Sequence, residues 1–168
     1  KCISSVVKVH EVVEGSSDFN ISGKSPENAH KQLVCIGRLN ENKNFITLFK
    51  AVSILKLKRS DFSVSMYYTS NESEDDLKAY CTKNNLNDYI KFKGAIPKTQ
   101  IESVLNSADV FVSCSLYEGS GYSLIEALAC GTFPVVSYIP AFDFLLKGLD
   151  KKEQFRPKNE LELAAKLN

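Results

Sequence analysis

The sequence has no tryptophan, one methionine, two histidines and no long hydrophobic run. No apolar stretch approaches the ~20 residues that a membrane-spanning helix needs, and residues 1–10 lack the apolar core of a secretory signal peptide. The sequence therefore predicts a chain without a transmembrane segment or an export signal. The methionine is Met66, so Lys1 is not a natural start, and we expect the chain to be part of a longer protein.

An excess of charge of either sign is also missing. The 168 residues carry 21 Lys and Arg against 20 Asp and Glu, a net charge of +1. A nucleic-acid-binding protein that works through a broad basic face needs a clear basic excess, so nucleic acid is not an expected partner. Hydrophobic residues make up 43% and charged residues 24% of the chain, which is typical of one globular domain.

Patterns of metal ligands are absent from the sequence. The five cysteines are widely spaced without a C-x-x-C pair, and neither His10 nor His30 has a Cys, His or carboxylate partner at ligand spacing. There is no D-x-D motif, so we expect neither a metal nor another cofactor. The odd number of cysteines, three of them in apolar segments, predicts buried reduced thiols and a cytoplasmic protein.

Segments typical of strands and of helices alternate along the chain. We expect strands at residues 5–9, 33–37, 62–68, 89–92, 109–113 and 134–137. Helices are expected after Asn44, after Ser73, after Pro97, over residues 122–130 and at the C-terminal LELAAKLN. Asn44 is predicted to cap the first helix, and the pairs Ser73–Asp76 and Thr99–Glu102 resemble capping boxes.

This alternation predicts the fold class. Strands joined by helices form right-handed βαβ crossovers, which give a Rossmann-like, doubly wound α/β domain with a mainly parallel sheet and helices on both faces. Ligands of such domains bind beyond the carboxyl ends of the strands. We therefore expect the functional residues in the loops that follow Gly37, Tyr68, Phe92 and Ser113.

The most informative loop opens the segment SLYEGSGYSLIEALACGTFPVVS, residues 115–137. Gly119 and Gly121 precede a helix that begins at Tyr122, so the amides of Gly121, Tyr122 and Ser123 are expected to point outward with the positive end of the helix dipole. Such a terminus can hold a diphosphate. The dinucleotide fingerprint G-x-G-x-x-G is not met, because Leu124 occupies the third glycine position, and this disfavours a nicotinamide-dependent dehydrogenase.

Charged residues surround that loop. Glu118 precedes it and Glu126 lies one turn into the helix, where a carboxylate could accept hydroxyl hydrogen bonds from a sugar or a ribose. Arg38 and Lys43 follow the strand at residues 33–37 and could neutralise a diphosphate. Each has an ordinary alternative, since Glu126 could simply stabilise the helix dipole and both basic residues could be solvated loop side chains.

Three segments, taken in order, resemble a known family: GRLNENKNF at residues 37–45, FKGAIP at 92–97 and ADVFVSCSLYEGSGYSLIEALACGTFPVV at 108–136. They are similar to the C-terminal domain of family-four retaining glycosyltransferases of the GT-B fold. The resemblance implies one half of a two-domain GT-B enzyme, with residues 1–168 as a single nucleotide-sugar-binding domain and the N-terminal acceptor domain absent. The chain departs from the family at Ser120, where an aromatic residue is common, and at residues 68–70, where Gly-x-Gly is usual.

The resemblance also implies roles for individual residues. By position, the residues expected to take part in catalysis are Glu118, Arg38 and Lys43, and those expected to bind the donor are Glu126, Gly121, Tyr122, Ser123, Ala95 and Ile96. Arg38 and Lys43 match a phosphate-binding pair, Glu118 would lie near the donor sugar, and Glu126 would bind the nucleotide ribose. Ala95 and Ile96 would line the nucleobase.

The implied reaction is transfer of a sugar from a nucleoside diphosphate to an acceptor hydroxyl with retention of configuration, in polysaccharide or glycoconjugate biosynthesis. The acceptor glycan or lipid-linked sugar would bind through the absent domain, so this chain alone is expected to transfer little or nothing. The resemblance is also compatible with peripheral association of the full-length protein with the inner face of the membrane. Two alternatives stay open: a non-catalytic nucleotide- or partner-binding module of a glycosylation complex, and a nucleotide-sugar epimerase.

Overall fold

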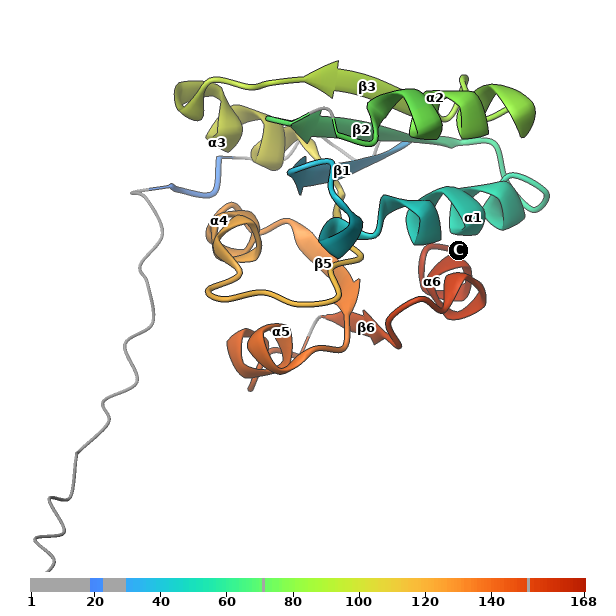
Figure 1. Cartoon of the computed structure of the whole chain (residues 1–168). Helices are drawn as coiled ribbons and strands as arrows, with labels where there is room; N and C mark the ends of the chain where they lie inside the picture. Colours follow the sequence, from blue (N-terminus) through green and yellow to red (C-terminus); the bar gives the residue numbers. More distant parts are fainter. Residues whose placement is uncertain (1–18, 23–29, 71, 151) are drawn as a thin grey trace, which may run out of the picture.

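The computed structural model describes residues 19–22, 30–70, 72–150 and 152–168 (Figure 1). Six strands form one sheet in the order β3-β2-β1-β4-β5-β6, and every neighbouring pair is parallel. The strands are β1 (Lys31–Gly37), β2 (Phe62–Tyr68), β3 (Ile90–Gly94), β4 (Val110–Ser113), β5 (Phe133–Ser137) and β6 (Glu153–Phe155). The strand expected at residues 5–9 lies outside the described residues.

Helices cover both faces of the sheet. They are the short 3-10 helix η1 (Glu41–Lys43) and the α-helices α1 (Phe45–Leu55), α2 (Glu74–Lys83), α3 (Lys98–Ser107), α4 (Tyr122–Ala129), α5 (Pro140–Leu145) and α6 (Glu160–Lys166). In Figure 1, α1, α2 and α6 lie on the right and α3, α4 and α5 on the left, with the strands between them. The predicted doubly wound α/β fold is confirmed.

Two hydrophobic cores hold these layers together. Leu33 and Cys35 of β1 point into the core formed with α1, α2 and α6, whereas Val34 between them points into the core formed with α3, α4 and α5. Since side chains alternate between the two faces of a strand, a strand covered on both faces needs a continuous apolar run. This is why β1, β4 and β5 read as unbroken hydrophobic segments in the sequence.

The strand order reverses between β1 and β4. The chain runs outward from β1 through β2 to β3 and then returns to place β4 on the other side of β1. The two loops that leave the carboxyl ends of β1 and β4 therefore diverge to opposite faces of the sheet and leave a crevice, which is the usual ligand site of doubly wound folds. This topology positions the site described below.

The helix starts differ from the predicted caps. Asn44 precedes α1 in the left-handed conformation, with φ 49°, and its side chain makes no capping hydrogen bond. Ser73 precedes α2 without a side-chain cap, and α3 begins at Lys98, so Thr99 lies inside the helix and cannot cap it. The capping-box predictions are wrong because spacing alone does not fix the backbone angles that aim a cap side chain at the helix.

Three short elements were not expected from the sequence: η1, α5 and β6. Helix α5 has six residues and β6 has three, too few for a periodic pattern to stand out. Helix α5 and strand β6 matter for the site: Phe142 of α5 is buried behind the start of α4, and β6 pairs with β5 and completes that edge of the sheet.

The described cysteines fit the sequence prediction. Cys35, Cys81 and Cys114 are buried and free, Cys130 is buried, and burial raises the pKa of the Cys81 thiol to about 11. Cys2 lies outside the described residues. Within the described part of the chain, none of the helices has the length and apolar character that crossing a membrane requires.

Candidate functional site

The turn after β1 is joined to the loop after β4 by three hydrogen bonds. The Leu116 amide donates to the Asn42 carbonyl at 2.8 Å, and the Asn42 side chain returns a 2.8 Å bond from Nδ2 to the Tyr117 carbonyl. Behind them, Asn44 Nδ2 donates to the Cys114 carbonyl at 3.4 Å. Residues far apart in the sequence are thus held side by side at the carboxyl ends of two central strands.

An ion pair crosses the same junction. Lys43 Nζ lies 2.5 Å from Glu118 Oε1, and both side chains are mostly buried, at 17% and 15% exposure. Lys43 reaches Glu118 by passing over Gly37, where an added Cβ would lie 2.9 Å from the Lys43 Cε atom. Ser115 Oγ donates to the same Glu118 oxygen at 2.6 Å. The phosphate-binding lysine and the sugar-binding glutamate of the sequence prediction are therefore direct neighbours.

Helix α4 begins beside this pair. Gly121 has φ 67° and ψ 34°, a left-handed conformation that glycine adopts at little cost. The first helical hydrogen bonds are donated by Leu124 and Ile125, both to the Gly121 carbonyl. The amides of Tyr122 and Ser123 stand ahead of these bonds, so they have no acceptor within the helix. The positive end of the α4 dipole is thus available to an anion.

These groups line one cavity of about 450 Å³ at the strand-order reversal. Its walls include seven of the nine predicted site residues: Arg38, Lys43, Ile96, Glu118, Tyr122, Ser123 and Glu126. Gly121 is not in the lining but fixes the start of α4, and Ala95 is exposed and lies outside the lining. Ile96 therefore contributes to this wall and Ala95 does not.

Glu126 is a buried acid in this cavity. It is 4% exposed, and the loss of water around it raises its pKa, which nearby Lys98 partly opposes. A carboxylate that only stabilised the helix dipole from the surface would be solvated, so its burial in the cavity wall favours a ligand-binding role. Arg38 is exposed at the rim, where the solvated-loop alternative stays open.

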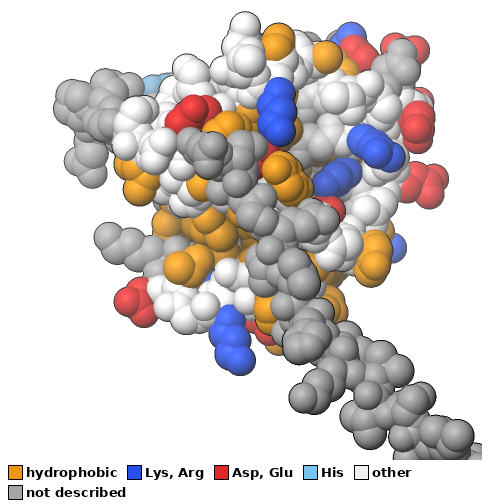
Figure 2. All heavy atoms as spheres, turned by 90° about the vertical axis from the view of Figure 1, so that its left-hand side faces the viewer, with side chains coloured by type: hydrophobic (Ala, Val, Ile, Leu, Met, Phe, Trp, Pro, Cys, Tyr) orange, Lys and Arg blue, Asp and Glu red, His pale blue; other side chains and the backbone are white. Residues whose placement is uncertain are grey.

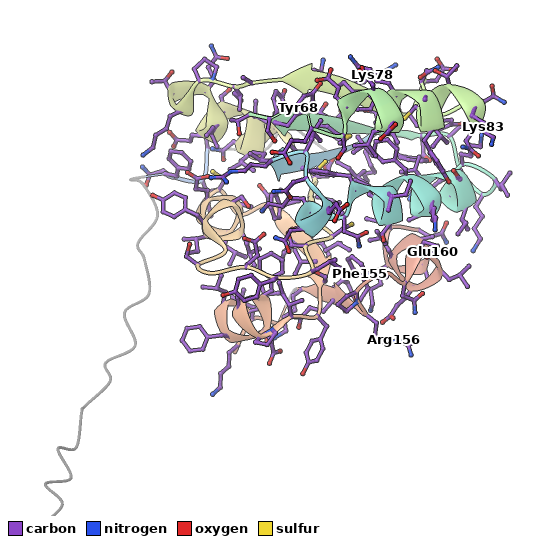
Figure 3. The ribbon with its side chains drawn as sticks, in the orientation of Figure 1. Tyr68, Lys78, Lys83, Phe155, Arg156 and Glu160 are labelled. Atoms are coloured by element: carbon purple, nitrogen blue, oxygen red, sulfur yellow. The ribbon has the colours of Figure 1, made fainter. Side chains whose placement is uncertain are left out.

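Sequence reasoning missed several residues of the cavity. Tyr67, Tyr68 and Thr69 line it from the end of β2, beside and within residues 68–70, where the resembled family has Gly-x-Gly. The Tyr68 hydroxyl bonds to Glu74 of α2, and burial, with Glu74 as a lesser cause, raises the Tyr68 pKa to about 12. The bond to Glu74 ties Tyr68 to the start of α2, and Glu74 also pairs with Lys78 at 2.5 Å. Tyr68 on β2 and Lys78 on α2 are labelled in Figure 3. The two tyrosines that end the segment FSVSMYY were the sequence signal that could have identified this wall of the cavity.

A larger cavity of about 640 Å³ lies between α1 and α2. Its lining combines apolar side chains, including Phe45, Leu77 and Tyr80, with polar and charged ones, and contains none of the predicted site residues. We assign the site to the smaller cavity, because that one lies at the reversal of strand order and is lined by seven of the nine predicted site residues.

Charge is mixed around the site. Figure 2 shows the side of the molecule that lies on the left in Figure 1, and on its described part both basic and acidic side chains are present, with hydrophobic side chains between them. A continuous basic face of the kind that binds nucleic acid is not seen there. Within the described ranges, no three His, Cys, Asp or Glu residues lie close enough together to hold a metal ion.

The start of α4 gives a first testable prediction. In Gly121→Ala the new Cβ would lie 2.9 Å from Leu145 Cδ1 in a backbone conformation that L-residues disfavour, so we expect a loss of about 1–3 kcal/mol in unfolding free energy. Gly119 has ordinary φ and nothing within 4 Å of an added Cβ, so Gly119→Ala should change stability by less than about 0.5 kcal/mol. Urea denaturation measures both, and equal losses would contradict this packing.

Glu126 gives a pH-dependent prediction. Its pKa in the folded chain lies above the ordinary value of 4.5, so folding is penalised once pH rises through 4.5 toward the folded-state value and remains so above it. Glu126→Gln should therefore raise the unfolding free energy at pH 7 by on the order of 1 kcal/mol. The gain should disappear below about pH 4. Thermal denaturation across this range tests it, and a gain independent of pH would show that burial of the charge is not the cause.

The amino-acid sequence of this chain matches a family model and several known proteins. The family model described as glycosyl transferases group 1 matches residues 17–168. A GDP-mannose:cellobiosyl-diphosphopolyprenol alpha-mannosyltransferase of Komagataeibacter xylinus is 24% identical over 119 residues, covering 70% of this chain and 30% of that protein. The amylovoran biosynthesis glycosyltransferase AmsK of Erwinia amylovora is 30% identical over 125 residues, with coverages of 71% and 30%. The chain thus spans about a third of the length of these relatives.

Solved structures share the fold. The C-terminal domain of LpcC, a glycosyl transferase group 1 family protein from Francisella tularensis, matches with a TM-score of 0.76 and 19% identity, over 89% of this chain and 83% of that one. A mutant of S. aureus TarM, solved with fondaparinux, alpha-GlcNAc-glycerol and UDP, matches with a TM-score of 0.79 and 20% identity. The match covers 96% of this chain and 32% of that one. The chain therefore belongs to the glycosyl transferases group 1 family and has the Rossmann-like fold of its GT-B members.

Proposed function

We propose that this chain is the donor-binding domain of a retaining glycosyltransferase that transfers a sugar from a nucleoside diphosphate to an acceptor hydroxyl. One observation carries the proposal: basic side chains, two carboxylates and the N-terminus of α4 line a single cavity at the strand-order reversal. The named relatives are transferases, which disfavours a nucleotide-sugar epimerase and a non-catalytic module.

The diphosphate would bind at the start of α4. The amides of Tyr122 and Ser123 would donate to its oxygens, and Lys43 and Arg38 would supply positive charge. Negative charge grows on the diphosphate as the glycosidic bond breaks, and fixed donors and cations that face it lower the barrier. Because Lys43 is paired with Glu118 in this structure, binding would turn Lys43 toward the phosphates.

The two carboxylates would bind the hydroxyl-rich parts of the donor. Glu118 would accept hydroxyl hydrogen bonds from the sugar, and Glu126 would accept them from the ribose, whose two hydroxyls would replace the water that burial removes. Ile96 offers an apolar surface to the nucleobase. These roles follow the sequence prediction, except that Ala95 has no place in the cavity wall.

The acceptor would bind elsewhere. Since the chain spans about a third of its relatives, we propose that residues 1–168 form one nucleotide-sugar-binding domain and that a longer protein supplies a second, acceptor-binding domain. The relatives' names support an acceptor glycan or lipid-linked sugar and a role in polysaccharide or glycoconjugate assembly. The buried free thiols of Cys35, Cys81 and Cys114 support a cytoplasmic location. Peripheral association with the membrane stays a prediction.

Calorimetric titration of the chain with UDP, GDP and ADP tests donor binding. We expect saturable binding of one nucleotide and an affinity about tenfold lower in Arg38→Ala and in Lys43→Ala, since each removes a charge-assisted phosphate contact. Lys50 is an exposed lysine that lines the other cavity, so Lys50→Ala is the matched control and should bind like the unchanged chain. Equal weakening by all three substitutions would contradict a specific phosphate site.

The pairing of Lys43 with Glu118 gives a sharper prediction. Glu118→Gln removes the negative charge that Lys43 must leave, so UDP or GDP without a sugar should bind at least as tightly as before. Sugar transfer by the longer protein should nevertheless fall by about 100-fold or more, because the carboxylate that orients the sugar is lost. Weaker nucleotide binding together with unchanged transfer would overturn the role given to Glu118.

A further inference from the structure

Three buried serine hydroxyls lie at the carboxyl ends of β4 and β5. Ser113 is 9% exposed, and Ser115 and Ser137 are fully buried. Removing a hydroxyl from water without a new partner costs about 1–3 kcal/mol. All three have partners here: Ser137 Oγ donates to the Ser115 carbonyl at 2.5 Å, and Ser113 Oγ lies 3.1 Å from Ser115 Oγ. Both of these contacts converge on Ser115.

The hydrogen bonds of Ser115 have a definite direction. A serine hydroxyl has one proton to donate, and an ionised carboxylate only accepts. Ser115 Oγ gives its proton to Glu118 Oε1 at 2.6 Å, so in the neighbouring contact Ser113 must be the donor and Ser115 the acceptor. The chain therefore runs from Ser113 through Ser115 to Glu118, and each bond polarises the next toward the carboxylate.

Glu118 is held at one oxygen only. Lys43 Nζ and Ser115 Oγ both donate to Oε1, and among the described residues no group donates to Oε2. The two donors differ in freedom, because the Lys43 ammonium ends a long flexible side chain, whereas the short side chain of Ser115 is buried two residues after β4. If Lys43 turns to a diphosphate, Ser115 is the donor that remains on Glu118.

We propose that Ser115 is a positioning residue, whose hydroxyl keeps the Glu118 carboxylate aimed at the donor sugar after Lys43 has turned to the diphosphate. This inference rests on the proposed function and adds a residue that contacts Glu118 and not the donor. Ser115 lies two residues beyond β4, where Ser137 Oγ donates to its carbonyl and Ser113 Oγ to its hydroxyl, so residues at the strand ends hold it in place. A carboxylate that loses this support can shift by ~1 Å, enough to slow a reaction by about 100-fold.

The test uses the longer protein that carries this chain. In Ser115→Ala we expect kcat to fall about 10- to 100-fold, while the affinity for UDP or GDP without a sugar stays within about twofold. Thr132→Val is the matched control: Thr132 Oγ1 donates to the Leu105 carbonyl at 2.7 Å, is 1% exposed, and lies before the amino end of β5. It should lower the melting temperature comparably and leave kcat unchanged.

A second readout separates positioning from stability. Ser115→Ala should weaken binding of the nucleotide sugar about three- to tenfold, and it should add no further loss in the Glu118→Gln background. Ser115→Cys keeps a donor at this position, though a weaker one, and should lie between the alanine variant and the unchanged protein. An unchanged kcat in Ser115→Ala, or an equal added loss in the Glu118→Gln background, would overturn the inference. Absence of nucleotide binding and transfer in the unchanged protein would overturn the proposed function and, with it, this role.

Discussion

The site depends on the hydrogen bonds that join the turn after β1 to the loop after β4. The bond from Leu116 to the Asn42 carbonyl and its return bond from Asn42 to Tyr117 bring together residues that are some 75 positions apart. Without them, Lys43 and Glu118 would sit on separate loops with no fixed relation. The left-handed conformation of Asn44 and its bond to Cys114 serve the same junction. The cavity is thus a consequence of the hydrogen bonds that join the two loops at the carboxyl ends of β1 and β4.

The charges of the site compensate one another within the chain. Lys43 and Glu118 form a mostly buried pair, and removing one partner of such a pair leaves an uncompensated charge. A bound donor would supply replacements for both, with phosphates for the lysine and sugar hydroxyls for the glutamate. Glu126 has no comparable partner among the described residues, and its raised pKa records the cost of that burial. A bound donor can therefore gain binding energy from Lys43, Glu118 and Glu126, whose charges the fold keeps partly or fully buried.

The sequence predicted the long elements well and the short ones poorly. The helix at Phe45–Leu55 and the strand at Phe62–Tyr68 have clear periodicity, because each buries a regular set of side chains. Helix α5 and strand β6 were missed, since six and three residues carry no period. The helix caps failed for a different reason: the residue types were suitable, but the backbone angles at Asn44 and Ser73 did not aim their side chains at the helix.

The sequence could predict those parts of the site whose positions follow from the topology of the sheet alone. Parallel strands bring their carboxyl ends to one edge, so residues after β1 and β4 had to meet, as Lys43 and Glu118 do. The place of Ala95 outside the cavity wall could not be foreseen, because a turn after an edge strand can point either way. Ser115 could not be assigned a role from spacing, since its value lies in a hydrogen bond to one oxygen of Glu118 that only the three-dimensional arrangement reveals.

The most direct test of donor binding at the start of α4 is an NMR titration of the ¹⁵N-labelled chain with the nucleoside diphosphate that it binds. We predict that the amide signals of Tyr122 and Ser123 shift most, because these amides have no acceptor within the helix and both residues line the cavity. Shifts confined to Phe45, Leu77 and Tyr80, in the cavity between α1 and α2, would contradict the proposed site.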